Sequence, residues 1–286
     1  MNVATKRPIL TAYQQSIAAY WNNKTQDGVN LRLGEVDGIY HHHYGLGPYD
    51  PELLHAPKPG RDDEIIKELH RLETAQANVL LDQFGDVAET DRLLDAGCGR
   101  GGTSILARER FGCSVDGVTI SEYQVAFARE KANARGHQDH VRFHLRNMLD
   151  TGFPSGSFRG IWTNETTMYV DLFALFDEFA RLLRAGGRYV CITGCYNDVI
   201  GEKSPAVRTI DKHYLCDVHP RSRYFKALAA SHLVPGTVID LTPQTMPYWE
   251  LRAQSSLRTG IEEPFLAGYR DGSFQYLLIA ADRARD

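Results

Sequence analysis

The stretch LLDAGCGRGG, residues 93–102, joins a short apolar run to a glycine-rich turn, and a helix-like segment, TSILARERF, follows it. The apolar run predicts a buried strand that delivers Asp95 to the turn. Gly97, Gly99 and Gly101 lie in this turn, where glycine lets the backbone adopt positive φ and approach a ligand closely. The stretch therefore predicts the ligand-binding end of an α/β fold.

Helix and strand patterns alternate on both sides of this stretch. Because such alternation produces a parallel sheet covered on both faces, we expect a doubly wound α/β fold with a mostly parallel, seven-stranded sheet. The last strand, which follows a Tyr-Arg-Asp-Gly turn, is expected to be an antiparallel edge. The expected strands are 92–97, 114–120, 141–148, 160–165, 188–194, 236–243 and 273–281. The expected helices are 65–84, 103–111, 121–136, 171–187, 221–233 and 248–258.

The chain is expected to divide into a helical N-terminal cap and a larger α/β domain. Residues 1–63 form the cap and a segment that covers the substrate. Residues 64–286 form the domain, in which 196–234 is a substrate-side insertion. The charged, proline-containing stretch HAPKPGRDDE, residues 55–64, predicts an exposed linker between the two parts.

Composition excludes several classes of partner. The 286 residues are 43% hydrophobic and 24% charged with a net charge of −4, which argues against binding nucleic acid through a broad basic face. No apolar run is long enough to span a membrane, and the start has no signal-peptide core. The five cysteines include no CxxC pair, so we expect reduced thiols and a cytoplasmic protein without a membrane partner.

The glycine turn also meets a second pattern, because Gly97, Gly99 and Gly102 have the G-x-G-x-x-G spacing of dinucleotide sites. Such a site needs an acidic residue about 20 positions further on, where it binds the ribose hydroxyl. Here the corresponding segment is GVTISEYQ, residues 117–124, and Thr119 stands in the place of the acid. An NAD-dependent oxidoreductase is therefore the disfavoured alternative.

The combination of DAGCGRGG with GVTIS-x-x-Q resembles the methyltransferases that use S-adenosyl-L-methionine (SAM). More narrowly, it is similar to the branch that methylates carbon–carbon double bonds, which includes sterol C-methyltransferases and cyclopropane fatty acid synthases. In that branch a Thr or Asn replaces the ribose acid. The resemblance implies the class I, Rossmann-like methyltransferase fold with SAM at the glycine turn. The alternative is a helix-capping turn whose glycines are only structural.

The same resemblance implies which residues surround the cofactor. Tyr20 and Trp21 lie on an expected cap helix, where they either close over SAM or only pack the cap. The expected cofactor contacts are Tyr20, Asp95, Ala96, Gly97, Gly99, Thr119, Ser121, Gln124, Asn147, Met148 and Asn164.

Glu165 lies in GIWTNETTMYVDLF, residues 160–173, where a buried strand runs into a helix. Ligands of open α/β sheets bind at the carboxyl ends of the strands, so Glu165 points toward the same crevice as the glycine turn. Methylation of an alkene leaves a carbocation, and its completion needs a base, aromatic faces and the exclusion of water. Glu165 is the candidate base. The alternative is that it pairs with an arginine or caps the helix that begins near Tyr169.

The segment NLRLGEVDGIYHHHYGLG, residues 30–47, precedes the domain and contains three successive histidines. Consecutive side chains rarely point the same way, so a tridentate metal site is not expected there. Asn30, Arg32 and His41–His43 are donors suited to an anionic head group, although a polar loop covering the crevice is the alternative. The aromatic candidates for a cation are Tyr44, Tyr49, Tyr169, Tyr214, Tyr224, Phe225 and Trp249.

Four further segments carry a closer resemblance. VNLRLGEVDGIYHHHYG, TNETTMYVD, VPGTVIDLTPQTMPYWELR and GYRDGSFQYLLIAADR resemble the family of bacterial C-methyltransferases that act on geranyl diphosphate. These enzymes make 2-methylgeranyl diphosphate, the precursor of 2-methylisoborneol. The likeness covers nearly the whole chain apart from the first dozen residues and the linker. It implies that SAM and geranyl diphosphate are the substrates and that Mg²⁺ accompanies the diphosphate.

The resemblance also assigns roles. Glu165 falls on the family's base, Tyr44 on its active-site tyrosine, and Tyr214 where the family has an aromatic residue facing a tertiary cation at C3. We leave open whether Glu165 takes the C2 proton directly or through Tyr44, a water or the diphosphate. The expected substrate contacts are Asn30, Arg32, His43, Tyr169 and Trp249.

The sequence does not assign the residues that ligate Mg²⁺ or the number of copies in an oligomer. Because no D-D-x-x-D run occurs, the residues that ligate Mg²⁺ are not assigned, and the diphosphate and water are expected to hold it. A homo-oligomer is expected. The alternatives are a sterol- or lipid-alkene methyltransferase and a SAM-binding partner protein without catalytic activity.

Overall fold

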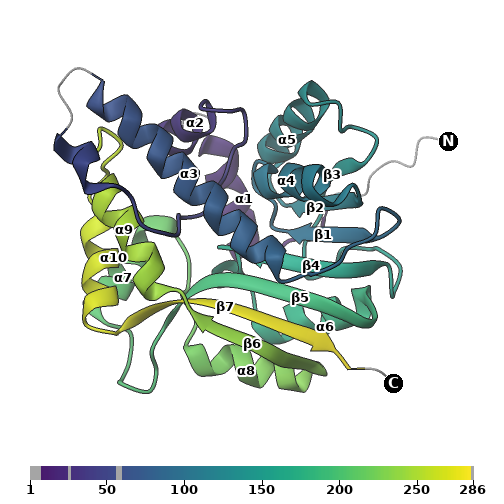
Figure 1. The fold of residues 1–286 in the computed structure, drawn as a ribbon. Helices are drawn as coiled ribbons and strands as arrows, with labels where there is room; N and C mark the ends of the chain where they lie inside the picture. Colours follow the sequence, from purple (N-terminus) through teal and green to yellow (C-terminus); the bar gives the residue numbers. More distant parts are fainter. Residues whose placement is uncertain (1–7, 25–26, 56–59, 285–286) are drawn as a thin grey trace.

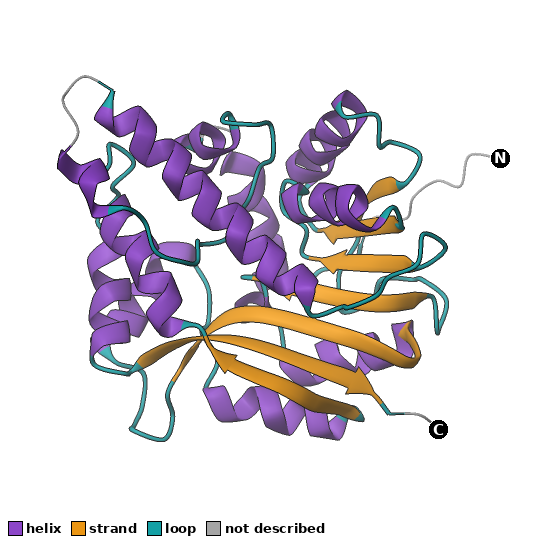
Figure 2. Ribbon diagram, in the orientation of Figure 1, coloured by secondary structure: helices purple, strands orange, loops and turns teal. Residues whose placement is uncertain are grey.

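A seven-stranded sheet forms the centre of the computed structural model, which describes residues 8–24, 27–55 and 60–284. The strand order is β3-β2-β1-β4-β5-β7-β6, and helices cover both faces (Figures 1 and 2). The strands are β1 Arg92–Ala96, β2 Ser114–Thr119, β3 Val141–Leu145, β4 Phe158–Asn164, β5 Leu183–Tyr196, β6 Leu233–Asp240 and β7 Phe274–Arg283. Strands β1 to β5 run parallel, which confirms the predicted doubly wound fold.

The last strand differs from the prediction in its position. Strand β7 is antiparallel, as expected, but it lies between β5 and β6, so β6 forms the edge. The reason is hydrophobic burial. From Tyr276 to Ala281 the residues of β7 are all buried, whereas most residues of β6 are exposed. The more apolar strand therefore takes the covered position inside the sheet.

The helices bury their apolar faces against the two sides of the sheet. Helices α3, α4 and α5 pack on one face, and α6 and α8 pack on the other (Figure 1). The bounds are α1 Ala12–Asn23, α2 Gly28–Gly34, α3 Arg61–Asp82, α4 Gly102–Phe111, α5 Glu122–Ala134, α6 Leu172–Leu182, α7 Pro205–Tyr214, α8 Arg221–Ala230, α9 Thr242–Arg252 and α10 Glu262–Arg270. Short 3-10 turns occur at Pro51–His55 and Thr167–Tyr169.

Two predicted helices have different bounds in the structure, and two other helices were not predicted. The helix expected at 171–187 ends at Leu182, and β5 begins at the next residue because Leu183 already pairs with Phe158. The helix expected at 248–258 begins six residues earlier, since Pro243 sits in its first turn. Helices α7 and α10 were not predicted. Together with α9 they group at one end of the sheet (Figure 1).

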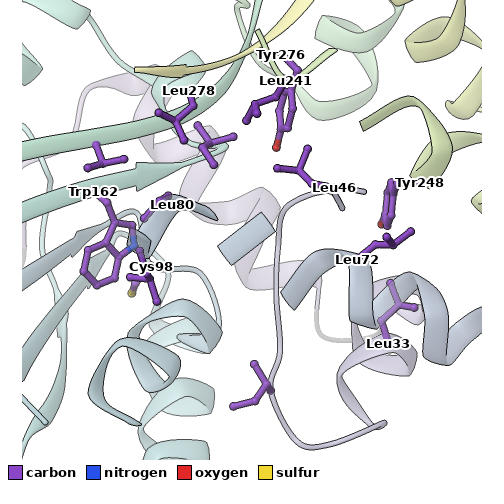
Figure 3. Packing of buried hydrophobic residues seen from close by; sticks show 14 of the residues in the cluster. Leu33, Leu46, Leu72, Leu80, Cys98, Trp162, Leu241, Tyr248, Tyr276 and Leu278 are labelled. Atoms are coloured by element: carbon purple, nitrogen blue, oxygen red, sulfur yellow. The ribbon is translucent and has the colours of Figure 1, made fainter. Parts of the chain in front are cut away.

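The N-terminal segment shares a core with the sheet. Leu33 and Leu46 belong to the same buried cluster as Trp162 and Leu278 of the sheet, and Figure 3 shows Leu33 near Leu72 at one side of this cluster and Trp162 near Leu80 at the other. Helix α3 begins at Arg61, so the predicted division at 63/64 falls inside its first turn. That division and the 196–234 insertion remain predictions. Of the predicted linker, residues 56–59 lie outside the described part.

Within the described ranges, no helix combines the length and the apolar content that crossing a bilayer requires.

Candidate active site

A cavity of about 670 Å³ opens at the carboxyl ends of β1, β2 and β4. The N-terminal segment supplies one wall, and the glycine turn and the end of β4 supply the other. Most of the predicted site residues meet there. Those that line the cavity are Tyr20, Asn30, His43, Tyr44, Asp95, Gly97, Gly99, Thr119, Gln124, Asn147, Met148, Asn164, Glu165, Tyr169 and Tyr214.

Four predicted residues lie outside the lining. Arg32 is half exposed and pairs with Glu35 at 3.2 Å and Asp63 at 2.9 Å, so its predicted contact with the substrate is corrected to a surface ion pair. Trp249 is fully buried and stacks on Phe265 at a ring distance of 3.8 Å. Its predicted place in the substrate wall is corrected to a layer behind that wall.

Ala96 and Ser121 support the cofactor side without lining it. Ala96 is buried at the end of β1. Ser121 caps α5, where its hydroxyl accepts from the Gln124 amide, and it donates to Asn22 at 2.8 Å. The cap helix α1 is thereby tied to the end of β2.

Within the glycine turn, Gly97 lies against the side chain of Thr166. Its φ is 84°, and a Cβ at this position would lie 2.3 Å from Oγ1 of Thr166. The backbone N–H groups of Gly97 and Cys98 both donate to the carbonyl of Val118, which fixes the turn beside β2. A side chain at residue 97 would therefore collide with Thr166, and only glycine fits this turn.

The polar groups around this turn hold one another in place. Asp95 is buried and accepts a hydrogen bond from Ser104 at 2.6 Å, and burial raises the pKa of Asp95 to about 7. Thr119 donates to Gln124 Oε1 at 2.6 Å. This set of carboxyl, hydroxyl and amide groups matches the needs of an amino-acid and ribose moiety.

The part of the cavity around Asn147 includes a residue that sequence reasoning missed. Gln14 of α1 is buried and exchanges hydrogen bonds with Asn147 in both directions, each at 3.2 Å. The side chain of Gln14 also accepts from the backbone of Thr11 in a capping box that starts the helix. The capping box is a sequence signal for the helix start, but the pairing with Asn147 depends on how the cap docks.

Arg100 ties the glycine turn to the N-terminal segment. It is buried, and its guanidinium lies 2.8 Å from His42, 3.3 Å from Asp27 and 3.0 Å from the carbonyl of Lys24. Burial opposes ionisation of Asp27, but hydrogen bonds from His42 and Asn30 and the charge of Arg100 hold the pKa of Asp27 well below its usual range. The segment is therefore attached to the cofactor turn by a buried ion pair.

The three successive histidines take different partners. His42 pairs with Asp27 at 3.1 Å, whereas His41 Nδ1 lies 3.1 Å from His43 Nε2. His43 also contacts the backbone carbonyl of Tyr44. Burial lowers the pKa of all three rings, so they are neutral near pH 7. Among the described residues, no group of three or more His, Cys, Asp or Glu side chains is arranged to hold a metal ion.

Glu165 is held at the end of β4 in a left-handed conformation, with a φ of 52°. Its carboxylate accepts from the backbone N–H of Gly194 at 3.1 Å and from the hydroxyl of Tyr276. Burial outweighs these hydrogen bonds and raises the pKa of Glu165 to about 8. The carboxylate therefore makes neither of the structural contacts considered as alternatives, and Asp171 caps the following helix instead.

Aromatic rings form the wall opposite the cofactor turn. The ring of Tyr44 lies 4.5 Å from Trp249 and 5.0 Å from Phe265, and its hydroxyl bonds to that of Tyr214. Tyr169 donates to the carbonyl of Tyr214 at 3.3 Å. Three other aromatic candidates, Tyr49, Tyr224 and Phe225, lie outside the lining.

Basic groups at one part of the cavity were also missed. Lys24, His213 and Arg252 all line it, and Arg252 is buried with Glu262 at 3.1 Å. Burial and the charges of Lys24 and Arg252 lower the pKa of His213, so both cations act on this ring. Arg252 lies inside a quoted motif, YWELR, but its direction depends on how α9 packs against α3.

The fold and the site together define a class I SAM-dependent methyltransferase. In agreement, the family model described as "Methyltransferase domain" matches residues 93–187. The geranyl diphosphate 2-C-methyltransferase of Saccharopolyspora erythraea is 59% identical over 96% of this chain and 95% of its own length. The enzyme of that name from Streptomyces lasalocidi is 56% identical over 96% of this chain and 91% of its own length.

A solved structure agrees with these relatives. The geranyl diphosphate C-methyltransferase of Streptomyces coelicolor A3(2), in complex with Mg²⁺, geranyl-S-thiolodiphosphate and S-adenosyl-L-homocysteine, superposes with a TM-score of 0.93 at 54% identity. The match covers 96% of this chain and 99% of that one. The chain belongs to the geranyl diphosphate 2-C-methyltransferase family, and the predicted resemblance is confirmed.

Proposed function

We propose that this protein transfers a methyl group from SAM to C2 of geranyl diphosphate, which gives 2-methylgeranyl diphosphate and S-adenosylhomocysteine. The observation that carries the proposal is full-length similarity to enzymes of that activity. It is supported by a single cavity in which a glycine turn, a carboxylate and an aromatic wall face one another. The sterol- or lipid-alkene and non-catalytic alternatives have no comparable support.

The glycine turn and its polar neighbours fit SAM. Gly97 carries no side chain and so fits beside Thr166, and Gly97, Asp95, Thr119, Gln124 and Asn147 all line the cavity. When bound, SAM supplies an electrophilic methyl group on a sulfonium. Helix α1 is held over the cavity by two hydrogen bonds, from Gln14 to Asn147 and from Ser121 to Asn22. The residues of this chain thereby orient the cofactor and exclude water from it.

The aromatic wall and Glu165 serve the reacting carbons of the substrate. Attack by the C2=C3 double bond on the methyl group leaves a tertiary cation at C3, which the faces of Tyr214 and Tyr44 stabilise. Burial keeps both phenols neutral because it raises their pKa. Glu165 accepts the C2 proton, which restores the double bond and balances the reaction.

The diphosphate requires cationic and hydrogen-bonding groups at the opposite part of the cavity. Lys24 and Arg252 line it and provide positive charge, in place of the predicted Arg32, and the ring of His213, whose pKa is lowered, lines it as a neutral group. Asn30 and His43 also line the cavity and remain proposed contacts. Mg²⁺ enters with the diphosphate, since this ion prefers phosphate oxygens and water as ligands.

A mass-spectrometric assay tests the proposed function. The protein is incubated with SAM, Mg²⁺ and a panel of prenyl diphosphates from C5 to C15. We expect geranyl diphosphate to gain one methylene, and chelation of Mg²⁺ to suppress the gain. If no member of the panel gains mass while S-adenosylhomocysteine binds normally, the proposed substrate class is wrong.

Replacing Tyr214 separates cation stabilisation from binding. We expect Tyr214→Leu to lower kcat by roughly 10-fold or more with a smaller change in KM, because the cation exists only after the methyl transfer begins. Tyr214→Phe keeps the ring and is expected to keep most of kcat, while it removes the hydroxyl that bonds to Tyr44. Steady-state kinetics measure both. A loss confined to KM in Tyr214→Leu would contradict the cation role.

Assembly and location remain proposals. We expect a cytoplasmic homo-oligomer, and light scattering of the purified protein would determine the number of copies.

A further inference from the structure

Gln76 of α3 lies at the centre of a buried hydrogen-bond network behind the cavity. It is completely buried, and its Nε2 donates to Asn164 Oδ1 at 2.8 Å and to the hydroxyl oxygen of Tyr276 at 3.0 Å. Its Oε1 accepts from Asn164 Nδ2 at 2.9 Å. One amide thus connects α3, the end of β4 and β7.

The direction of these hydrogen bonds matters. Because the phenolic oxygen of Tyr276 accepts a hydrogen bond from Gln76 Nε2, the hydroxyl hydrogen of Tyr276 can be donated to another acceptor. The acceptor within its reach is the carboxylate of Glu165. The amide of Gln76 therefore orients the tyrosine hydroxyl toward the candidate base.

The network also reaches the cofactor side. Asn164, which lines the cavity, immediately precedes Glu165, and both of its amide atoms are fixed by Gln76. Glu165 itself adopts a φ of 52°, a conformation that a non-glycine residue holds only when its surroundings secure it. Its backbone N–H bonds to Ile192 and its carboxylate to Gly194.

We propose that Gln76 and Tyr276 are positioning residues: through one directed hydrogen-bond chain they hold the carboxylate of Glu165 for proton removal and Asn164 for the cofactor. Neither residue lines the cavity. The proposal rests on the proposed function, in which Glu165 is the base. Figure 3 shows Tyr276 among the buried side chains of the core, where water has no direct access to its hydroxyl.

The other groups around Glu165 leave Tyr276 as the side chain that donates to it. Burial and the charge of Glu165 raise the pKa of four neighbouring groups, so they stay neutral: Tyr44 of the N-terminal segment, Tyr269 of α10, Cys191 of β5 and Cys216 after α7. On α3, the carboxylate of Glu73 is engaged by Tyr248 at 2.9 Å. A hydrogen bond from Tyr276 favours the ionised form of Glu165.

The test is the pH profile of Tyr276→Phe. Loss of a donor to the carboxylate raises the pKa of Glu165 further, so the acidic limb of kcat/KM moves to higher pH by about one unit. The activity deficit is then about 10-fold below the limb and small at pH 9 and above. The dissociation constant for SAM, measured by calorimetry, stays unchanged. Gln76→Met is expected to give a smaller shift of the limb together with weaker SAM binding, because Asn164 also loses its partner.

Tyr189→Phe is the matched control. Tyr189 is a buried tyrosine on the neighbouring strand β5, and its hydroxyl lies 2.6 Å from Thr163. This substitution removes one buried hydroxyl of the same kind, so it is expected to lower the melting temperature without moving the pH profile. A Tyr276→Phe profile that coincides with the wild type, or a shift of equal size in Tyr189→Phe, would overturn the proposal.

A second measurement does not depend on catalysis. Infrared difference titration of Glu165, identified by its absence in Glu165→Gln, reports the carboxylate pKa directly in the substrate-free protein. The proposal expects a higher pKa in Tyr276→Phe and in Gln76→Met than in the wild type. If the pKa shifts but no prenyl diphosphate is methylated, the proposed function fails and the network stands. If methylation occurs and the pKa does not shift in either variant, the network fails alone.

Discussion

Glu165→Gln lowers kcat for methylation of geranyl diphosphate by roughly 10²–10⁴-fold, the range typical for loss of a general base. The amide fits the same place and accepts the hydrogen bond from Gly194, but it cannot take the C2 proton. Single-turnover kinetics with mass detection measure the loss. SAM binding is expected to stay near that of the wild type, because the proposed role of Glu165 is toward the reacting carbons of the substrate.

The same substitution is expected to stabilise the fold at alkaline pH. The folded-state pKa of Glu165, about 8, is raised above the ordinary value of 4.5, so its contribution to stability is fully present below pH 4.5 and is lost as pH rises through 8. Glutamine does not ionise, so the variant loses no stability at this position as the pH rises. The melting temperature of Glu165→Gln at pH 9 should therefore exceed that of the wild type by roughly a few degrees.

Glu178→Gln is the control for this result. Glu178 is a buried carboxylate on α6 that pairs with Arg181 at 2.7 Å and accepts from Thr151, away from the cavity. Its replacement should lower stability and leave kcat unchanged. Near-normal turnover by Glu165→Gln would show that another group removes the proton, with the substrate diphosphate as the first candidate.

Gly97→Ala is expected to have the second large effect, on cofactor binding. The new Cβ would lie 2.3 Å from Oγ1 and 2.8 Å from Cβ of Thr166, and rotation of the threonine cannot relieve the second contact. The turn must move, and the space for SAM narrows. We expect the dissociation constant for S-adenosylhomocysteine to rise roughly 100-fold, or about 2.7 kcal/mol, as measured by calorimetry.

Gly136→Ala separates this clash from backbone strain. Gly136 has a φ of 72°, close to that of Gly97, but a Cβ there would meet nothing within 4 Å. The left-handed backbone strains alanine in both variants, whereas only Gly97→Ala places a Cβ against Thr166 in the cavity. If the two variants weaken cofactor binding equally, the close approach at Gly97 is not what shapes the site.

The fold was predictable because it depends on periodic patterns and on local turn chemistry. Apolar runs separated by amphipathic helices require a covered parallel sheet, and the glycine turn at 97–102 locates its ligand-binding edge. Asp95, Thr119, Asn147 and Glu165 converge because the carboxyl ends of parallel strands share one edge of a sheet. These residues were found without knowledge of any contact.

The residues that were missed or misplaced come from segments that dock on the sheet without belonging to it. Three cavity residues were missed: Gln14 of α1, Lys24 at the end of α1, and Arg252 of α9. Arg32 was misplaced, because it points outward to Asp63 although it lies two residues after Asn30, which lines the cavity. No spacing rule fixes the angle at which such a helix packs. The partner of each side chain is decided by burial across the interface.

The amino-acid sequence by itself determined the parallel class of the sheet, the glycine turn at its ligand-binding edge and the carboxylate that follows β4, since strand periodicity and glycine conformation act over a few residues. The cofactor of that turn was named from the family resemblance. Only the tertiary structure decided which cations line the cavity, where β7 inserts and how Gln76 joins Asn164 to Tyr276. Those contacts join residues far apart in the chain, and their geometry follows from how much apolar surface the assembled layers can bury together.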